Sequence, residues 1–542
     1  MYFKIATVIV SLLIALIGNT NTVLAQDEQY PALLGQGLRS LRQTTAQDLI
    51  KVEKIEIEGN TVFSDSQLKK VIGSIEEKLI TLERLSQIRN QIEQFYIDRG
   101  YIGSNVFTPP QKIRDGTLRL RIIEGSLSLI EIEGNSNLKE EYMKARLPEL
   151  DRPIRDSDLI KALTQLKKDP LIKSIRGELD TIEPGKLLLT VEVEENKPIQ
   201  TQLNFANTYS PTIGSLGGTA TIIHQNLLGF GDRASVNYTI TEGINRYGVG
   251  YSIPFNKSGG RVTFDYVNAD SELIEEVISA FDIQADYEGL KLSIQQPIIN
   301  NEIEEFVFSI GLDKLRSETF VAENISFPFV DGLEDGVSRI TPLRIGQEYT
   351  RRGNKNLLAA KSQFNIGLDL FNATFNETGI DGAFWSWLGS VQWIRAFDKD
   401  GNWQLRTSLT TQLTPDKLLP LEQLTVGGLG SVRGYRQNLI VGDNGIVAVA
   451  EGQIPVIKTN KWGSLYLVPF LDLGTIWSNY SDSADNQTNT LASVGLEMNY
   501  QIEQFLSTKV FYGIPLSNTK DFGDASAEKR WGFSISVIPF KF

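Results

Sequence analysis

Residues 198–542 alternate apolar and polar residues along many short segments, and no other feature constrains the fold as strongly. In residues 403–412, for example, Trp403, Leu405 and Leu409 alternate with polar residues. A period of two places successive side chains on opposite faces of a β-strand. Beyond the first 25 residues, no stretch of 18 consecutive apolar residues offers a membrane-spanning helix. The pattern therefore predicts antiparallel sheet, in a soluble protein or in a transmembrane β-barrel.

Three features favour the barrel. The candidate strands number sixteen, an even number as in bacterial single-chain barrels, and 345 residues leave about 22 for each strand with its connection. Aromatic residues lie near the strand ends, where a membrane barrel carries its girdles. The final strand, Trp531–Phe542, ends on Phe542, and a change of phase within it predicts a bulge. The sixteen strands are expected to begin near residues 201, 219, 233, 246, 261, 287, 306, 342, 361, 385, 403, 445, 465, 490, 506 and 530.

Charge density separates this region from the residues before it. Residues 26–197 contain 26 Lys/Arg and 29 Asp/Glu, whereas residues 198–542, twice as many, contain 26 and 37. A highly charged segment is typical of a water-soluble domain, and the boundary falls at Lys197–Pro198. The sequence thus predicts a soluble front part followed by the sheet.

The front part contains an internal repeat. Ile55–Asn60 reads IEIEGN, and Ile130–Asn135 repeats the same six residues 75 positions later. Each copy is followed by two segments of helical period and then by two strands. The helices are expected at 65–75 and 79–99, and at 138–147 and 156–168. We therefore predict two small α+β domains, each a three-stranded sheet with two helices on one face.

Several function classes are excluded by composition. The chain has no cysteine and one histidine, His224, so thiolate catalysis and the usual Cys/His zinc sites are impossible. His224 is interpreted as a strand residue before a turn. A net charge of −13 argues against nucleic-acid binding. A histidine-based triad would have to use His224, and we expect no catalytic role for it.

The N-terminus has the features of a secretory signal peptide. Lys4 precedes an apolar run from Ile5 to Ile17, and a polar stretch follows that ends in Val23-Leu24-Ala25. We predict a signal peptide over residues 1–25, cleaved after Ala25. An uncleaved anchor is the alternative, although 13 apolar residues are short for a span.

The first repeat resembles a known module. Residues 95–102 read FYIDRGYI and are followed by Pro109–Ile113, by Leu118–Leu120 and by Glu124-Gly125. This pattern is similar to the first POTRA domain of two-partner secretion transporters, the hemolysin/hemagglutinin secretion-activation family. Residues 126–197 resemble the second. The resemblance implies a POTRA domain at 51–125, another at 126–197, and a barrel at 198–542.

A glycine-rich segment lies in the long connection near residues 413–444. It reads GGLGSVRGY over 427–435, and its glycines alone would suit a flexible hairpin loop. A phosphate-binding loop is excluded because no parallel strand and helix flank it. Val432, Arg433, Gly434 and Tyr435 resemble the sixth extracellular loop of the Omp85 superfamily. In that superfamily the loop folds back into the barrel lumen with its arginine at the tip.

A lumenal arginine requires an acidic partner, since a buried unpaired charge costs several kcal/mol or so. The strand near Leu465 supplies Asp472, which alternates with leucines and is therefore expected to face the lumen. Phe470, Asp472 and Gly474 together resemble the superfamily's second barrel motif, which contacts the loop arginine.

The resemblance implies an outer-membrane transporter with periplasmic POTRA domains. Such a protein captures an unfolded partner protein and exports it through the sixteen-stranded barrel to the cell surface. The alternative is a barrel-assembly factor of the same superfamily, which inserts other barrels. The resemblance also implies no enzymatic activity, no catalytic residue, and no cofactor, metal or nucleotide. The expected partners are a secreted protein and outer-membrane lipid, with no nucleic acid and no nucleotide. Residues 26–50 form either the plug helix of this family, with its linker, or a disordered leader.

Overall fold

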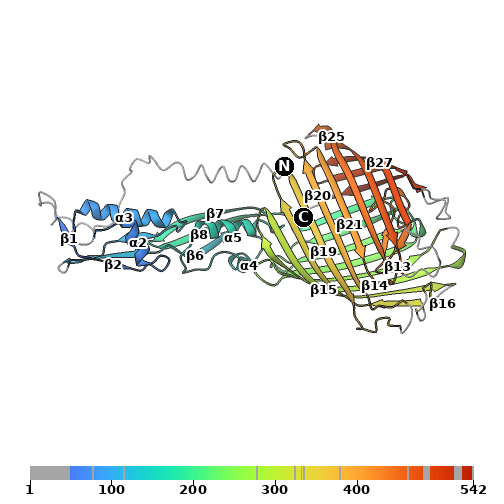
Figure 1. Ribbon diagram of the computed structural model, residues 1–542, viewed down its shortest axis with the longest axis horizontal. Coiled ribbons are helices and arrows are strands. Elements are labelled where there is room, and N and C mark those ends of the chain that lie inside the picture. The colour runs from blue at the N-terminus through green and yellow to red at the C-terminus, as the bar shows by residue number, and fades with distance from the viewer. Residues whose placement is uncertain are drawn as a thin grey trace. The chain divides into compact units, whose positions relative to one another are not determined.

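The computed structural model describes residues 49–542 except for several short gaps, and its elements are drawn in Figure 1. The predicted signal peptide and most of residues 26–50 therefore lie outside the described residues. The gaps are residues 76–77, 114–115, 276–278, 323–324, 331–332, 334–335, 377–379, 460–462, 480–488, 518–527 and 540–542.

The first domain contains the predicted strand, two helices and two strands in that order, with two short strands, β1 and β3, in addition. Its sheet has the order β2-β5-β4, in which β2 pairs parallel with β5 and β4 pairs antiparallel with β5. A separate two-stranded sheet pairs β1 with β3. The elements are β1 (Ile50–Val52), β2 (Lys54–Glu58), α2 (Asp65–Ile72), β3 (Lys78–Ile80), α3 (Leu82–Ile97), β4 (Asn105–Phe107) and β5 (Thr117–Ile123).

Helix α3 shows why this domain has a core. Its buried residues, Leu85, Ile88, Ile92 and Tyr96, recur every three or four positions and so share one face. The Tyr96 hydroxyl donates to Glu124 at 2.8 Å, which satisfies the one polar group of this fully buried ring. The predicted helix start at residue 79 is wrong, because the Thr81 hydroxyl accepts from the Arg84 N–H and caps the helix there.

The second domain repeats the arrangement. Its sheet has the order β6-β8-β7. The helix predicted over 138–147 is shorter, because the Leu138 N–H is bound by the Glu195 carboxylate at 2.9 Å and lies outside the helix. The elements are β6 (Ser126–Glu133), α4 (Glu140–Lys144), α5 (Asp156–Leu166), β7 (Ile172–Glu183) and β8 (Lys186–Glu195).

Both copies of the repeated sequence end in the same turn. Gly59 and Gly134 have φ of +85° and +80°, and a Cβ on either would lie 2.2 or 2.3 Å from a carbonyl oxygen of the neighbouring strand. Glu124 then accepts from the N–H groups of Thr61 and Val62, each at 2.9 Å. Glu195 does the same in the second copy. A glutamate at the end of the last strand thus holds the turn that follows the first strand.

Residues 199–537 form a closed antiparallel barrel of sixteen long strands, which confirms the predicted fold. Every predicted strand begins within about five residues of an observed one. Two short strands, β16 (Ile325–Ser326) and β17 (Val337–Ile340), pair beside β15. The long strands are β9 (Ile199–Ala206), β10 (Gly217–His224), β11 (Arg233–Thr241), β12 (Ile244–Pro254), β13 (Arg261–Glu272), β14 (Gln284–Asn300), β15 (Glu304–Val321), β18 (Pro342–Arg352), β19 (Asn356–Gly367), β20 (Trp385–Ala396), β21 (Gln404–Leu413), β25 (Asn444–Thr459), β26 (Gly463–Trp477), β27 (Asn489–Ile502), β28 (Leu506–Pro515) and β30 (Trp531–Val537).

The two faces of the strands differ in exposure. On β26, Leu471 and Leu473 are 52% and 45% exposed on the outside, whereas Phe470 and Asp472 are buried on the inside. His224 ends β10 and its Nδ1 accepts from the Asn226 N–H, as expected of a strand residue before a turn. No helix among the described residues is long and apolar enough to cross a membrane.

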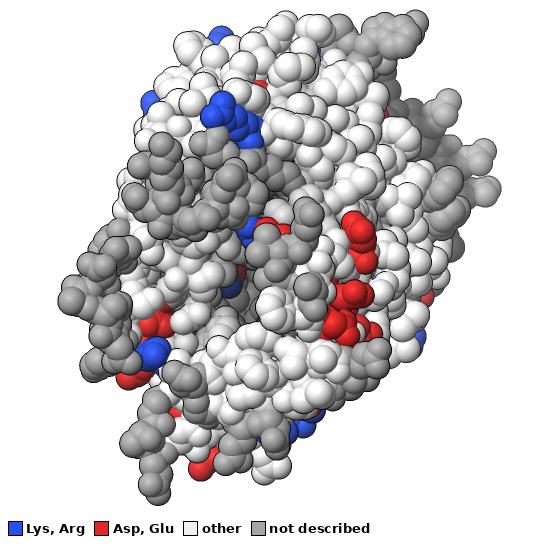
Figure 2. Space-filling model, turned by 90° about the vertical axis from the view of Figure 1, so that its right-hand side faces the viewer, with Lys and Arg blue, Asp and Glu red and all other residues white. Residues whose placement is uncertain are grey.

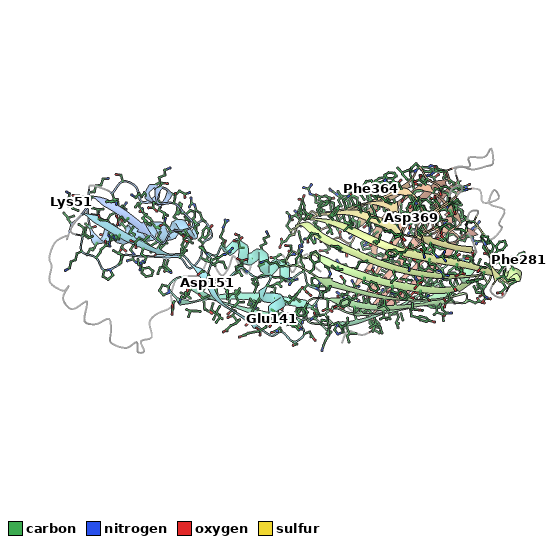
Figure 3. The ribbon with its side chains drawn as sticks, turned by 90° about the horizontal axis from the view of Figure 1, so that it is seen from below. Lys51, Glu141, Asp151, Phe281, Phe364 and Asp369 are labelled. Carbon is green, nitrogen blue, oxygen red and sulfur yellow. The ribbon has the colours of Figure 1, made fainter. Side chains whose placement is uncertain are left out.

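Two details of the predicted strands differ. Apolar and polar residues alternate in the sequence from Phe364 to Leu370, but β19 ends at Gly367, and the Leu370 N–H donates to the Leu368 carbonyl in a turn. Figure 3 labels Phe364 in this strand and Asp369 in the turn. The last strand ends at Val537, and Phe542 lies outside the described residues.

Candidate functional site

The connection between β21 and β25 carries the predicted motif and forms a hairpin. Its stem pairs β22 (Leu424–Val426) with β24 (Ile440–Gly442), and its tip contains β23 (Gly434–Tyr435). Val432, Arg433 and Tyr435 are at most 4% exposed. An exposed hairpin loop is therefore excluded.

The hairpin tip lies inside the barrel. Arg433 contacts Asp472 of β26, which is on the opposite face from the exposed leucines of the same strand. Gly434 and Tyr435 pair with Glu528 and Lys529 of β29, in the connection before the last strand. Figure 2 looks onto an end of the barrel that is hollowed at its centre, and charged side chains of both signs lie in the hollow.

Arg433 makes a two-pronged contact with Asp472. Its Nη2 and Nε donate to the two carboxylate oxygens at 2.7 and 2.8 Å, and its backbone N–H donates to Oδ2 at 3.0 Å. Asp472 is fully buried, so its charge depends on these three donors for stabilisation.

Two further carboxylates surround the same guanidinium, and neither belongs to the sequence motifs. Nη1 lies 2.7 Å from Glu451 Oε1 on β25 and 3.5 Å from Glu497 Oε2 on β27. Lys509 Nζ lies 4.0 Å from Glu497. Their signal in the sequence is the one that revealed Asp472, a charge within an otherwise apolar or uncharged strand, but nothing in the pattern pairs them with Arg433.

Asp472, Glu451 and Glu497 form a socket for the Arg433 side chain at the hairpin tip, and other motif residues line it or lie beside it. The Arg433 guanidinium carbon lies 3.6 Å from the centre of the Phe470 ring, a stacking distance. A Cβ on Gly474 would lie 2.5 Å from Val426 and 2.9 Å from Val432, so only glycine admits the hairpin here. Gly434, with φ of +97°, lets the tip approach the backbone of Gly513.

Tyr435 fixes the tip at its far side. Its hydroxyl donates to the Ala492 carbonyl at 2.9 Å and accepts from the Ser517 N–H at 3.0 Å. Val432 and Tyr435 also belong to the apolar cluster that Val426, Ile440 and Ile476 form. All seven predicted site residues therefore take part in the contact between the hairpin and the barrel wall, and two of them, Phe470 and Asp472, touch the Arg433 side chain.

Comparison with known proteins identifies the family. The profile described as haemolysin secretion/activation protein ShlB/FhaC/HecB matches residues 185–500, more than half of the chain. The chain belongs to this family. A second profile, described as POTRA domain, ShlB-type, matches residues 50–125. These matches confirm the family suggested by the sequence motifs. As a member, the chain is an outer-membrane transporter, and its POTRA domains lie in the periplasm.

Individual relatives agree with this assignment. The chain is 22% identical to the outer membrane transporter CdiB of Escherichia coli O6:K15:H31 (strain 536 / UPEC), over 82% of this chain and 76% of that protein. The solved structure of CdiB from Escherichia coli matches with a TM-score of 0.65 at 20% identity, covering 94% of this chain and 92% of that one. BamA from Haemophilus ducreyi lacking POTRA domains 1–3 gives 0.56 at 15% identity, over 90% and 99%. At these identities the two structures show a shared fold.

Proposed function

We propose that this transporter captures an unfolded partner protein in the periplasm and exports it through the barrel to the cell surface, as in two-partner secretion. The observation that carries the proposal is the family match across the barrel, together with the POTRA match before it. The transporter catalyses no reaction and requires no nucleotide. The similarity to BamA concerns the fold, so insertion of other barrels is the less supported alternative.

The second domain offers a place for capture by strand addition. Strand β7 is 12 residues long and lies at an edge of its sheet, where among the described residues it has strand partners on one side only. The other edge strand, β6, has a backbone bridge from Ser126 to Pro153. An extended chain that adds to an open edge is held by its backbone, with little demand on its sequence. Strand β7 is therefore the edge we assign to the partner.

Export of the protein encoded beside this gene tests the proposal. Deleting residues 126–197 should stop secretion of that protein while the barrel is still inserted, because the capture edge is lost. The matched measurement is the amount of barrel in the outer membrane. Continued secretion by the deletion variant would refute the role of the second domain.

The hairpin tip has a separate role in this proposal. The contact between Arg433 and Asp472 holds the tip in the lumen. The loop must move from this position when the partner passes through the barrel. The roles of Val432, Gly434, Tyr435, Phe470 and Gly474 follow from their contacts with these two residues. Secretion by variants of Arg433 and Asp472 tests this role of the hairpin tip.

A further inference from the structure

A second buried ion-pair cluster holds the same hairpin at its base. Glu422 lies just before β22, and its carboxylate faces Arg344 of β18. Arg344 Nη2 donates to Glu422 Oε1 at 2.6 Å, and Nη1 donates to Oε2 at 3.1 Å. The remaining edge of the guanidinium donates through Nε to Asp313 of β15 at 2.6 Å. One arginine therefore joins the loop to the barrel wall.

Burial and charge balance make this cluster strong. The side chains of Glu422 and Asp313 are 7% and 6% exposed, and that of Arg344 is 20% exposed. Lys291 Nζ lies 3.8 Å from Asp313, so two cations face two carboxylates. Asn365 accepts a further bond from Arg344 Nη1 at 3.0 Å. A carboxylate held by both prongs of a guanidinium has a fixed direction as well as a fixed distance.

The base cluster and the tip socket use different parts of the wall. Strands β19, β20, β21 and β25 lie between β18 and β26 in the barrel. The base also packs through Leu418 and Leu419, both at most 1% exposed, against an apolar cluster that includes Leu315 and Phe384. The hairpin is thus fixed at two separate points, with its paired stem between them.

Asp443 links the two limbs of the hairpin at its base. Its carboxylate accepts from the Leu418 N–H at 3.0 Å and from the Gln423 side chain at 3.1 Å, and so ties the returning limb of the hairpin to the outgoing one. Gln423 is the next residue after Glu422, so Glu422 lies where the two limbs of the hairpin are linked.

We propose that Glu422 and Arg344 are positioning residues for the hairpin. They fix the direction in which the stem enters the barrel, and this direction brings Arg433 to Asp472. The inference deepens the proposed function, because it names residues outside the motif that control the lumenal loop. It depends on the export function only where secretion is measured.

A single thiol can report the position of the tip. Ser493 of β27 pairs across the sheet with Asp472, is fully buried, and its hydroxyl makes no hydrogen bond within the described residues. The chain has no cysteine, so Ser493→Cys introduces one buried thiol at little structural cost. Its rate of reaction with a maleimide measures how often the tip leaves the wall.

The test compares two variants that each remove one carboxylate from Arg344. Glu422→Gln removes the charge on the loop and leaves the contact between Arg344 and Asp313. Asp313→Asn removes a charge on the barrel wall and leaves the contact between Arg344 and Glu422. In full-length protein carrying Ser493→Cys, Glu422→Gln should raise the labelling rate about tenfold, which corresponds to the loss of one charged hydrogen bond. Asp313→Asn should stay within about twofold of the parent. Arg433→Ala is the positive control for tip release.

The proposal would be overturned if Glu422→Gln left the labelling rate at the parental value. It would also be overturned if Asp313→Asn raised the rate as much as Glu422→Gln does, since the cluster would then stabilise the barrel wall without directing the hairpin. Heat-dependent gel mobility verifies that each barrel is folded. If Glu422→Gln does not fold, Arg344→Lys, which retains the charge and loses the fork, should give an intermediate rate, and a parental rate there would count against us. Secretion is measured in parallel. If Glu422→Gln raises the labelling rate but the wild-type protein exports nothing, the export function is refuted and the positioning role of Glu422 and Arg344 is supported.

Discussion

At the scale of single residues, the arginine at the loop tip has more partners than its motif suggests. One guanidinium faces Asp472, Glu451 and Glu497, and Lys509 offsets part of the excess negative charge. The sequence predicted one acidic partner, because alternation shows which way a side chain points but not which strand faces it. The structure gives Arg433 three acidic neighbours, so the contact is asymmetric.

This asymmetry predicts unequal effects of removing the two partners. Arg433→Ala leaves three carboxylates together and should impair secretion more than Asp472→Ala, which leaves the arginine with two acidic neighbours. The double variant should be little worse than Arg433→Ala, with a coupling of roughly 0.5–3 kcal/mol. Arg433→Lys should be partly defective because an ammonium lacks the planar fork. The measurement is secretion at equal barrel abundance.

Glu497→Gln supplies a control for the same interpretation. In the Arg433→Ala background it removes one of the repelling charges and should restore part of the barrel's abundance or function. Additive losses in the first experiment, or wild-type secretion by Arg433→Ala, would mean that the loop is held by its apolar contacts alone.

At the scale of elements, the repeated turn after β2 and β6 depends on glycine for two reasons. Gly59 combines a positive φ with a carbonyl oxygen, that of Ile122, at 2.2 Å from the site of a Cβ. Gly73 has φ of +74° but open space around its Cβ site. A side chain at Gly73 would cause backbone strain alone, whereas a side chain at Gly59 would cause both strain and a steric clash.

Alanine at these two positions should have different costs. Gly73→Ala should lower the free energy of unfolding by about 1–3 kcal/mol through strain alone. Gly59→Ala should cost about 1–3 kcal/mol more because the Ile122 carbonyl must also move. Urea unfolding of fragment 51–197 measures both. Equal costs would show that the close approach at Gly59 is relieved without penalty.

Glu195 makes the second domain sensitive to acid. Burial opposes its charge, but hydrogen bonds from Leu138, Asn137 and Ser136 prevail and lower its pKa below the ordinary value of 4.5. Because the folded pKa is depressed, the stabilisation is complete above about pH 4.5 and is lost as the pH falls through the folded value. Glu195→Gln should therefore differ from the wild type at pH 7 and approach it in acid. Thermal unfolding of fragment 51–197 at several pH values provides the measurement, and a constant difference would contradict it.

The elements show why some boundaries could be predicted and others could not. Strand starts follow from period two, which continues until a turn interrupts it. Helix starts depend on single contacts, such as the Thr81 cap of α3 and the Glu195 carboxylate before α4. The second contact joins residues 57 positions apart, so no local pattern contains it.

At the scale of the whole molecule, the charge boundary at Lys197 predicts two separable parts. Fragment 51–197 should be soluble and should fold alone, because each domain encloses its own core. Fragment 198–542 should give the circular dichroism of β-structure in detergent and conduct ions in a planar bilayer. A helical spectrum without strand signal would contradict the barrel. Removing Phe542 should lower insertion efficiency at equal expression.

The architecture could be predicted from the sequence, but the anchoring of the loop could be predicted only in part. Sixteen strands and two repeated domains follow from periodicity and repetition. The motif resemblance placed Arg433 with Asp472. No sequence pattern indicated Glu422 and Arg344, because they lie 78 residues apart and no local pattern contains their contact.

Closure of the barrel has a consequence for biosynthesis. Strand β9, the first of the barrel, pairs with β30, the last, and the Gly434–Tyr435 tip pairs with β29. A chain interrupted during translation before residue 528 lacks both partners. Such a product keeps two unpaired strand edges, which can pair with another chain and aggregate, and its loop tip lacks one of its contacts. The barrel can therefore close only after the last strand has been synthesised.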